Sequence, residues 1–212
     1  MTFSKLTCYY IFNFYISFPI FADKGINISY GLDGQVSAYS VIFYQHFKLN
    51  IPLDKINVGY LIRLSNFSSR NNLFYTDSSS SEKSAEKSIQ IMSPNVYSLN
   101  TGVTANVDLI YNISLAFNLD IIGYSFGSSK NIVNTPVQAK PAPLNLFLYN
   151  INDLGSLNSE FYVYYLFNKY LVFRAGLSHY FSEYITETPL ADNSKRFRRI
   201  SNLFFFSCGI FF

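Results

Sequence analysis

Residues 106–127, NVDLIYNISLAFNLDIIGYSFG, place two aspartates among large apolar side chains, with no lysine or arginine nearby in the sequence. Beyond a turn at Tyr111 and Asn112 the residues alternate between two faces. One face carries Ile113, Leu115, Phe117, Leu119 and Ile121, and the other carries Ser114, Ala116, Asn118, Asp120 and Ile122. A period of two residues is typical of a β-strand whose faces meet different surroundings. The stretch therefore predicts a hairpin of two long strands, the first running back to residue 99.

The same alternation recurs along the rest of the chain. It is found at residues 25–31, 35–48, 56–65, 157–168, 170–184 and 200–212, which together with the hairpin gives eight predicted strands. Short connections (NIPLDK, YN and FNK) alternate with long ones at residues 68–95, residues 128–156 and TETPLADNSK. Strands that run up and down through a membrane produce this asymmetry, with turns on one side and loops on the other.

The composition is rich in aromatic residues and poor in charge. Aromatic residues make up 19% of the chain and charged residues only 14%, against about 25% in ordinary soluble domains. The net charge of +3 is spread out, so no nucleic-acid partner is expected. No run reaches about 18 uninterrupted apolar residues, which argues against a transmembrane helix.

The N-terminus has the pattern of an export signal. MTFSK supplies positive charge, LTCYYIFNFYISF supplies an apolar segment, and PIFA ends on a small residue, Ala22. We expect a signal peptide at residues 1–22 and a single barrel domain at residues 23–212; the alternative is that the first segment is a buried strand or helix. Only Cys208 would remain in the exported chain, so the cysteines point to neither catalysis nor a metal.

Alternation alone does not say which face meets water. An eight-stranded barrel has a narrow interior that side chains can fill. One face of these strands is bulky and apolar, and the other carries mainly Gly, Ser, Asn and Ala with some Tyr, so the small polar set suits the lumen. No lysine falls inside a predicted strand, as expected if a midplane lysine costs about 2–4 kcal/mol. The sequence predicts an all-β, eight-stranded antiparallel up-and-down transmembrane β-barrel.

The last strand carries a family resemblance. Phe204, Phe206, Cys208, Ile210 and Phe212 form an alternating apolar series that ends on an aromatic residue. This ending resembles the C-terminal strand of bacterial outer-membrane β-barrels. The stretches NVDLIYN…IIGYSFG, NINDLGSLNSEFYVYY and RFRRISNLFFFSCGIFF are also similar to small uncharacterised outer-membrane barrel proteins of Bacteroidetes. The resemblance implies a barrel fold and a location in the outer membrane of a Gram-negative cell, with no established activity.

Charged residues on the small-residue face are the candidate site. We expect these side chains to project into the lumen: Arg63, Asp108, Asp120, Glu160, Arg174 and Arg199. Removing each ion from water costs several kcal/mol, which favours pairing over isolation. The hypothesis is a structural plug of ion pairs and hydrogen bonds that leaves little room for a continuous pore. The alternative is that the charges line an ion path.

The sequence contains no recognisable set of catalytic side chains. His179 and Glu183 share a strand face but would lie about 13 Å apart, too far for a base and its orienting carboxylate, and Ser178 points to the opposite face. No phosphate-binding loop and no Cys/His metal spacing is present. The sequence therefore predicts no enzyme, no cofactor and no metal site.

The long loops remain as candidates for an extracellular partner, beside the lipid bilayer itself. Residues 68–92 are polar and expected to be mobile, whereas residues 141–151 (PAPLNLFLYNI) are unusually apolar. The latter could extend strands, fold over the barrel mouth or bind a partner. The predicted role is structural or a surface interaction through loops 68–95 and 128–156. The alternatives are a narrow channel for small solutes, a lipid-directed enzyme and a soluble lipocalin-like carrier.

Overall fold

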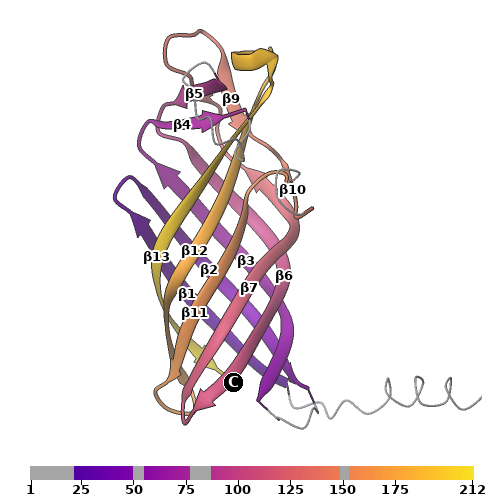
Figure 1. Cartoon of the computed structure of the whole chain (residues 1–212), viewed down its shortest axis with the longest axis vertical. Helices are drawn as coiled ribbons and strands as arrows, with labels where there is room; N and C mark the ends of the chain where they lie inside the picture. The colour runs from indigo at the N-terminus through magenta and orange to yellow at the C-terminus, as the bar shows by residue number, and fades with distance from the viewer. Residues whose placement is uncertain (1–21, 50–54, 77–86, 149–152) are drawn as a thin grey trace, which may run out of the picture.

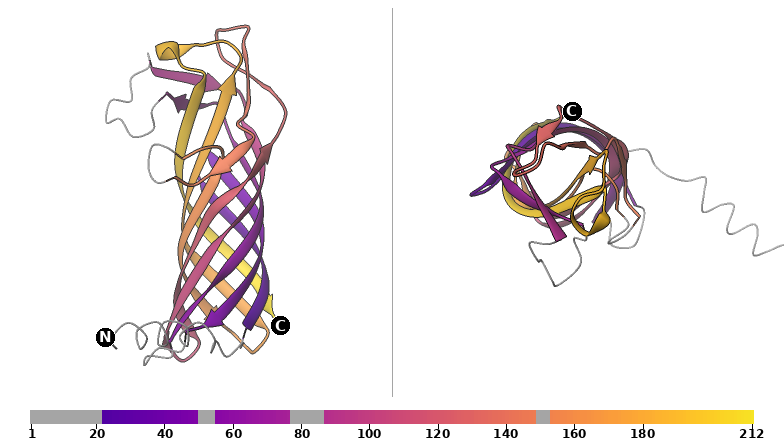
Figure 2. Two further views of the ribbon diagram at one scale, coloured as in Figure 1. Left: turned by 90° about the vertical axis from the view of Figure 1, so that its right-hand side faces the viewer. Right: turned by 90° about the horizontal axis from the view of Figure 1, so that it is seen from above.

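Eight long antiparallel strands close into a barrel, which Figure 1 shows from the side and Figure 2 also shows along its axis. The structure is a computed structural model that describes residues 22–49, 55–76, 87–148 and 153–212. The barrel strands are β1 (Ala22–Asp33), β2 (Val36–Lys48), β3 (Ile56–Ser69), β6 (Asn95–Ile110), β7 (Ile113–Phe126), β11 (Leu157–Leu166), β12 (Leu171–Thr186) and β13 (Arg196–Phe211). The ring closes because β13 pairs with both β12 and β1. The predicted all-β, eight-stranded antiparallel up-and-down barrel is confirmed.

The connections follow the predicted asymmetry. At the turn end the chain reverses within residues 111–112 and residues 167–170. At the loop end β1 and β2 are joined by two residues, and a 3-10 turn at Ala191–Asn193 lies between β12 and β13. The predicted signal peptide falls almost wholly on residues 1–21, outside the described residues, and Ala22 begins β1. None of the described helices is both long and apolar enough to span a membrane.

One residue of the predicted pattern is wrong, and a β-bulge explains it. Ile122 was expected on the lumen face, but its side chain is 46% exposed on the outside. The pairing of β6 with β7 slips by one residue: Thr101 pairs with Ile122, and Gly102 pairs with Asp120. Ile121 is the extra residue, so every side chain beyond it changes face.

The outer surface of the barrel is apolar. Ile28, Phe204 and Phe206 are each about two-thirds exposed, at 65%, 67% and 68%. Outward-facing side chains elsewhere on the wall are of the same kind, including Leu64, Leu99, Val103, Phe117, Phe161, Leu177 and Ile210. Lysine lies only near the ends of the described barrel strands, at Lys24 and Lys48.

Aromatic pairs mark the two edges of this apolar wall. Toward the loop end, the rings of Tyr30 and Tyr39 lie 4.6 Å apart, and Tyr97 stacks on Phe126 at 5.7 Å. Toward the turn end the pairs are Phe47 with Tyr60 and Phe167 with Phe173. Aromatic girdles of this kind flank the lipid-facing band of membrane barrels.

The interior is not uniformly small and polar, because it also holds bulky apolar side chains. Ile42, Tyr44 and Leu61 form one buried apolar cluster inside the barrel. Tyr162 and Phe205 form another with Ala116. Small residues alone would leave empty space, and close-packed interiors tolerate few voids. The bulky side chains therefore fill the lumen between the polar groups.

A second, smaller ring of strands stands on the loop end of the barrel, which Figure 1 shows above the long strands. It uses β4 (Asn72–Tyr75), β5 (Ser88–Ile91), β8 (Lys130–Asn131), β9 (Gln138–Pro141) and the upper ends of β12 and β13. Pairings run β13–β4–β5, then β8–β9–β12–β13. A bridge between Ile91 and Ile132, with a 2.9 Å hydrogen bond from Met92 N to Asn131 O, joins the two halves. We call this ring the cap.

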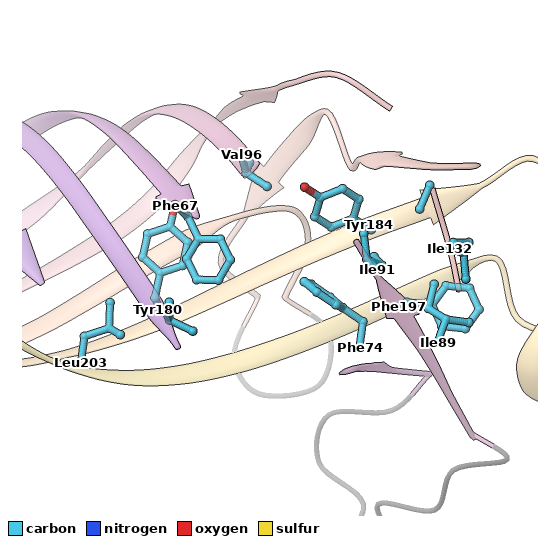
Figure 3. Close-up of a cluster of buried hydrophobic side chains, with 12 residues drawn as sticks. Phe67, Phe74, Ile89, Ile91, Val96, Ile132, Tyr180, Tyr184, Phe197 and Leu203 are labelled. Carbon is cyan, nitrogen blue, oxygen red and sulfur yellow. The ribbon is translucent and has the colours of Figure 1, made fainter. Parts of the chain in front are cut away.

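The cap has an apolar core, which Figure 3 shows, built from side chains of β4, β5, β9, β12 and β13 and from Ile132, just beyond β8. The core comprises Phe74, Ile89, Ile91, Ile132, Ala139, Tyr184 and Phe197. Below it Phe67 stacks on Tyr180 at 4.9 Å, still in the same cluster. The prediction that residues 68–92 form a polar, mobile loop is therefore wrong for the described residues 68–76 and 87–92.

The apolar segment after Pro141 extends the barrel wall. β10 (Leu144–Leu146) pairs with β7, and Leu144 lies opposite Tyr124 with its side chain half exposed. Of the three alternatives for residues 141–151, strand extension is the one found for residues 144–146. Residues 149–151 lie outside the described residues.

Candidate functional site in the lumen and cap

Arg63 occupies the centre of the lumen with two carboxylates. Its Nε lies 2.9 Å from Oδ1 of Asp120, and its terminal nitrogen NH1 contacts Oε1 of Glu160. Neither Arg63 nor Asp120 has any exposed side-chain surface, and Glu160 has almost none. The three residues come from β3, β7 and β11, so the sequence separation between Arg63 and Glu160 is 97 residues. Barrel closure, rather than local sequence, brings them together.

Amide groups complete the hydrogen bonding of both carboxylates. Asn100 donates to Oδ2 of Asp120 at 2.8 Å, and the backbone N–H of Asn158 donates to the same oxygen at 3.1 Å. Asn118 donates to Oε2 of Glu160 at 2.8 Å. Buried carboxylates bonded in this way avoid much of the penalty that isolated buried charges carry.

Arg174 lies near this triad but is held differently. Its guanidinium carbon sits 4.4 Å from the ring centroid of Tyr44 and 5.0 Å from that of Tyr162. Among the described residues it forms no ion pair within 4.0 Å. A cation–π contact stabilises a desolvated guanidinium by about 2 kcal/mol or more. Arg63 and its two carboxylate partners together carry a net negative charge. The positive charge of Arg174 offsets it.

A hydrogen-bonded chain runs from the centre to the turn end. The chain passes from His46 through Asn106 to Asn57, with distances of 3.3 and 2.7 Å. Asp108 stands at its lower end, where it accepts hydrogen bonds from Ser114 at 2.6 Å and from Asn57 at 3.4 Å. Asp108 is therefore part of the lumen chain but makes no ion pair with the other described residues.

The chain also continues upward to the underside of the cap. Oδ1 of Asn100 accepts a 2.7 Å hydrogen bond from Asn145, whose own Oδ1 accepts from Ser125 at 2.8 Å. Ser65 and Ser98 form a 2.7 Å hydrogen bond beside Tyr180. Asparagine amides and guanidinium groups do not titrate at ordinary pH, so they interrupt any proton relay along this path. The arrangement can fix the barrel wall, and the hydroxyl of Thr104, 3.0 Å from Nε2 of His46, is buried within it.

Arg199 lies apart from the central group. Its Nε donates to Ser201 Oγ at 3.2 Å, and its NH1 donates to the backbone oxygen of Leu73 at 3.3 Å. Because Leu73 belongs to β4, this contact ties the cap to β13. Of the six predicted lumen residues, the structure brings together Arg63, Asp120 and Glu160, with Arg174 close by, and it places Asp108 and Arg199 toward opposite ends.

Glu183 forms a second charged centre, at the base of the cap, that the sequence did not predict. Its buried carboxylate accepts two hydrogen bonds from Arg196, at 2.8 and 2.6 Å, and one from Arg198 at 3.0 Å. The N–H of Gly155 adds a fourth at 2.8 Å. Hydrogen bonding to Glu183 raises the pKa of Arg196. The RFRR run was the available signal, but its partner becomes visible only when β12 and β13 are paired.

The histidine considered for catalysis has another role. Nδ1 of His179 lies 2.6 Å from Oδ1 of Asn202 on the outer surface of the barrel, and Glu183 is engaged by the arginines. Within the cap, burial raises the pKa of Tyr184, so its hydroxyl stays neutral and donates to the backbone oxygen of Asn95 at 3.0 Å. No cluster of three potential metal ligands occurs among the described residues.

Comparisons with known proteins assign neither a family nor a role to this chain. No protein-family model matches the sequence, and no curated protein matches it. Among solved structures, Neisserial surface protein A aligns with a TM-score of 0.40 and 7% identity over 89% of this chain and 94% of its own. The Yersinia pestis outer membrane protein Ail, in a phospholipid bilayer nanodisc, aligns with a TM-score of 0.40 and 12% identity over 90% of this chain and 99% of its own.

Proposed function

We propose that this protein is an integral β-barrel of a Gram-negative outer membrane, made with a signal peptide at residues 1–22, whose working surface is its extracellular end. One observation carries the membrane location: the apolar side chains are on the outside of the barrel and the charges are inside. Phe204 and Phe206 are two-thirds exposed, while Arg63 and Asp120 have no exposed surface. In water this arrangement would expose a continuous apolar surface, which soluble monomers avoid.

The lumen supports a structural role over transport. A solute crossing the barrel would meet the Arg63 triad, the cluster of Ile42, Tyr44 and Leu61, and finally the apolar core of the cap. Each layer joins several strands, so opening a path would break buried ion pairs or a packed core. The narrow channel is therefore the weaker alternative, and the soluble lipocalin-like carrier conflicts with the apolar exterior. A lipid-directed enzyme has weaker support, because His46 and the Thr104 hydroxyl, whose Nε2 and Oγ1 lie 3.0 Å apart, are both buried inside the barrel and away from lipid.

The cap supports a surface interaction as the role. The two predicted long loops are residues 68–95 and 128–156. Over much of their described length they form paired strands around an apolar core. A rigid platform loses less conformational entropy on binding than a mobile loop does. The resemblance of the sequence to small Bacteroidetes barrels agrees with this proposal and adds no partner.

The proposal is tested by fractionation and by single-channel recording. The full chain, expressed in a Gram-negative host, should sediment with outer membranes, resist extraction by urea and show heat-dependent gel mobility. Reconstituted in planar bilayers, it should give no steady conductance. Recovery in the periplasm without detergent would overturn the membrane location, and a stable, large conductance in the wild-type protein would overturn the closed lumen.

A further inference from the structure

The outer face of the cap contains a hollow of about 350 Å³. Its walls are the turn between β8 and β9 and the end of β12, and its lining includes Ser129, Gln138, Lys140, Ile185, Glu187 and Thr188. This volume is at the lower end of the range for small-molecule sites. The hollow is built on paired strands, because Lys140 lies opposite Ile185 and Ala139 lies opposite Thr186.

Two opposite charges flank this hollow without meeting. Lys140 pairs in register with Ile185, and Glu187 follows two residues later, one residue beyond the end of β12. Both residues line the hollow. Both side chains are exposed, and neither forms an ion pair within 4.0 Å with any described residue. The neighbouring carboxylate of Glu183, at the base of the cap, differs, since it is saturated by Arg196, Arg198 and Gly155.

A ligand that satisfies both charges must carry both signs. A carboxylate would bind the ammonium group of Lys140, and an ammonium group would bind the carboxylate of Glu187. Ser129, Gln138 and Thr188 add neutral hydrogen-bonding groups at the wall, and Ile185 adds an apolar contact. Hydrogen bonds that involve a charged group are stronger than neutral ones, so a molecule making both contacts gains over one making either alone.

We propose that the hollow in the cap binds a small zwitterion, an amino acid or a dipeptide, with its carboxylate at Lys140 and its ammonium group at Glu187. The physiological meaning of this site rests on the proposed function, because free ligand reaches the cap only if that end of the barrel faces outward. The binding itself is a property of the purified chain and can be measured apart from its location.

The test uses ligand-observed NMR and calorimetry on the full chain in detergent micelles, with L-alanyl-L-alanine as the probe at roughly 1 mM. Acetate and methylammonium serve as probes with a single charge. Variants K140Q and E187Q each remove one charge, and the double variant K140E/E187K exchanges them. Lys195→Gln is the matched control, since Lys195 is an exposed cap lysine outside the hollow. Heat-dependent gel mobility checks that each variant is folded.

The dipeptide should bind the wild-type protein and Lys195→Gln equally, and it should bind K140Q and E187Q at least about tenfold more weakly. The double variant should recover binding, because a zwitterion can reverse its direction. Acetate and methylammonium should bind weakly throughout. Absence of dipeptide binding to folded wild-type protein would overturn the site. Dipeptide binding by K140Q and E187Q that is as tight as binding by the wild-type protein would also overturn it. If the dipeptide binds but fractionation places the protein outside the outer membrane, the site stands and the proposed function fails.

Discussion

Arg63 and Asp120 form a 2.9 Å ion pair across the lumen, although β6 lies between the strands that carry them. The same guanidinium also contacts Glu160, on β11. Strand pairing holds each strand only to its neighbours, whereas this triad links β3, β7 and β11 through the interior. Because both carboxylates are buried, the stability of the barrel depends on the guanidinium that compensates them.

Replacing Arg63 with methionine should therefore destabilise the barrel by about 3–5 kcal/mol, the cost of leaving buried charges without their partner. The measurement is urea unfolding in lipid vesicles, monitored by gel mobility or by tyrosine fluorescence, since the chain contains no tryptophan. Arg70→Gln is the control, because Arg70 is exposed and a surface change of this kind usually costs less than about 0.5 kcal/mol.

A triple variant separates lost charge compensation from lost packing. Arg63→Met combined with Asp120→Asn and Glu160→Gln removes the uncompensated carboxylates and keeps their shapes. It should be more stable than Arg63→Met alone, since replacing an entire buried ion group is often close to neutral. A triple variant that is no more stable than the single one would mean that the guanidinium contributes by packing and not by charge.

The lipid-facing surface makes a second prediction. Ile62 lies on the outer face of β3 and is 45% exposed, two residues from Tyr60 and four from Asn66 along the strand. Ile62→Lys should cost about 2–4 kcal/mol in a bilayer, and Asn66→Lys, which pairs with Tyr39 and Tyr97 at the edge of the wall, should cost roughly 0–1 kcal/mol. Vesicle unfolding measures both. Equal costs at the two positions would contradict the assignment of this surface to lipid.

The bulge on β7 gives a third prediction. A Cβ added to Gly102 would overlap the backbone oxygen of Leu119, next to the register shift, whereas a Cβ at Gly31 would meet only Leu203 and Phe205 at 3.4–3.5 Å. Both glycines face the lumen. Gly102→Ala should lose about 1–3 kcal/mol or fail to fold, and Gly31→Ala should be near neutral. Folding yield into vesicles, compared side by side, checks this. A well-folded Gly102→Ala would show that the bulge can shift.

Much of the barrel wall could be predicted from the sequence, because strand faces are a local property. Alternation placed Arg63, Asp120 and Glu160 on the inner face without any knowledge of their neighbours. It failed at Ile122, since an extra residue in a strand leaves no mark in a pattern of consecutive apolar side chains. Pairing partners inside the lumen also depend on the stagger of all eight strands, which no single strand specifies.

The cap could not be predicted for the same reason. Its strands are short, with two residues in β8 and four each in β4, β5 and β9. Its core joins Phe74, Ile132 and Phe197, which belong to short apolar stretches of one to three residues in polar surroundings of the sequence. Such residues give no periodic signal. They become a core only when the loops fold onto the upper ends of β12 and β13.

The two closures of the lumen should be separable, which is the last prediction. Phe74→Ala removes a ring that packs against Tyr184 at 5.2 Å in the core of the cap. The cavity should cost the cap about 3–5 kcal/mol and expose residues 70–76 and 87–92 to protease added outside intact cells. Conductance should stay near zero, because the Arg63 triad lies below the cap. Leu73→Ala on the exposed face of β4 is the control and should leave the protease pattern unchanged. Steady conductance in Phe74→Ala would show that the cap alone closes the barrel, and that the triad leaves room for ions to pass.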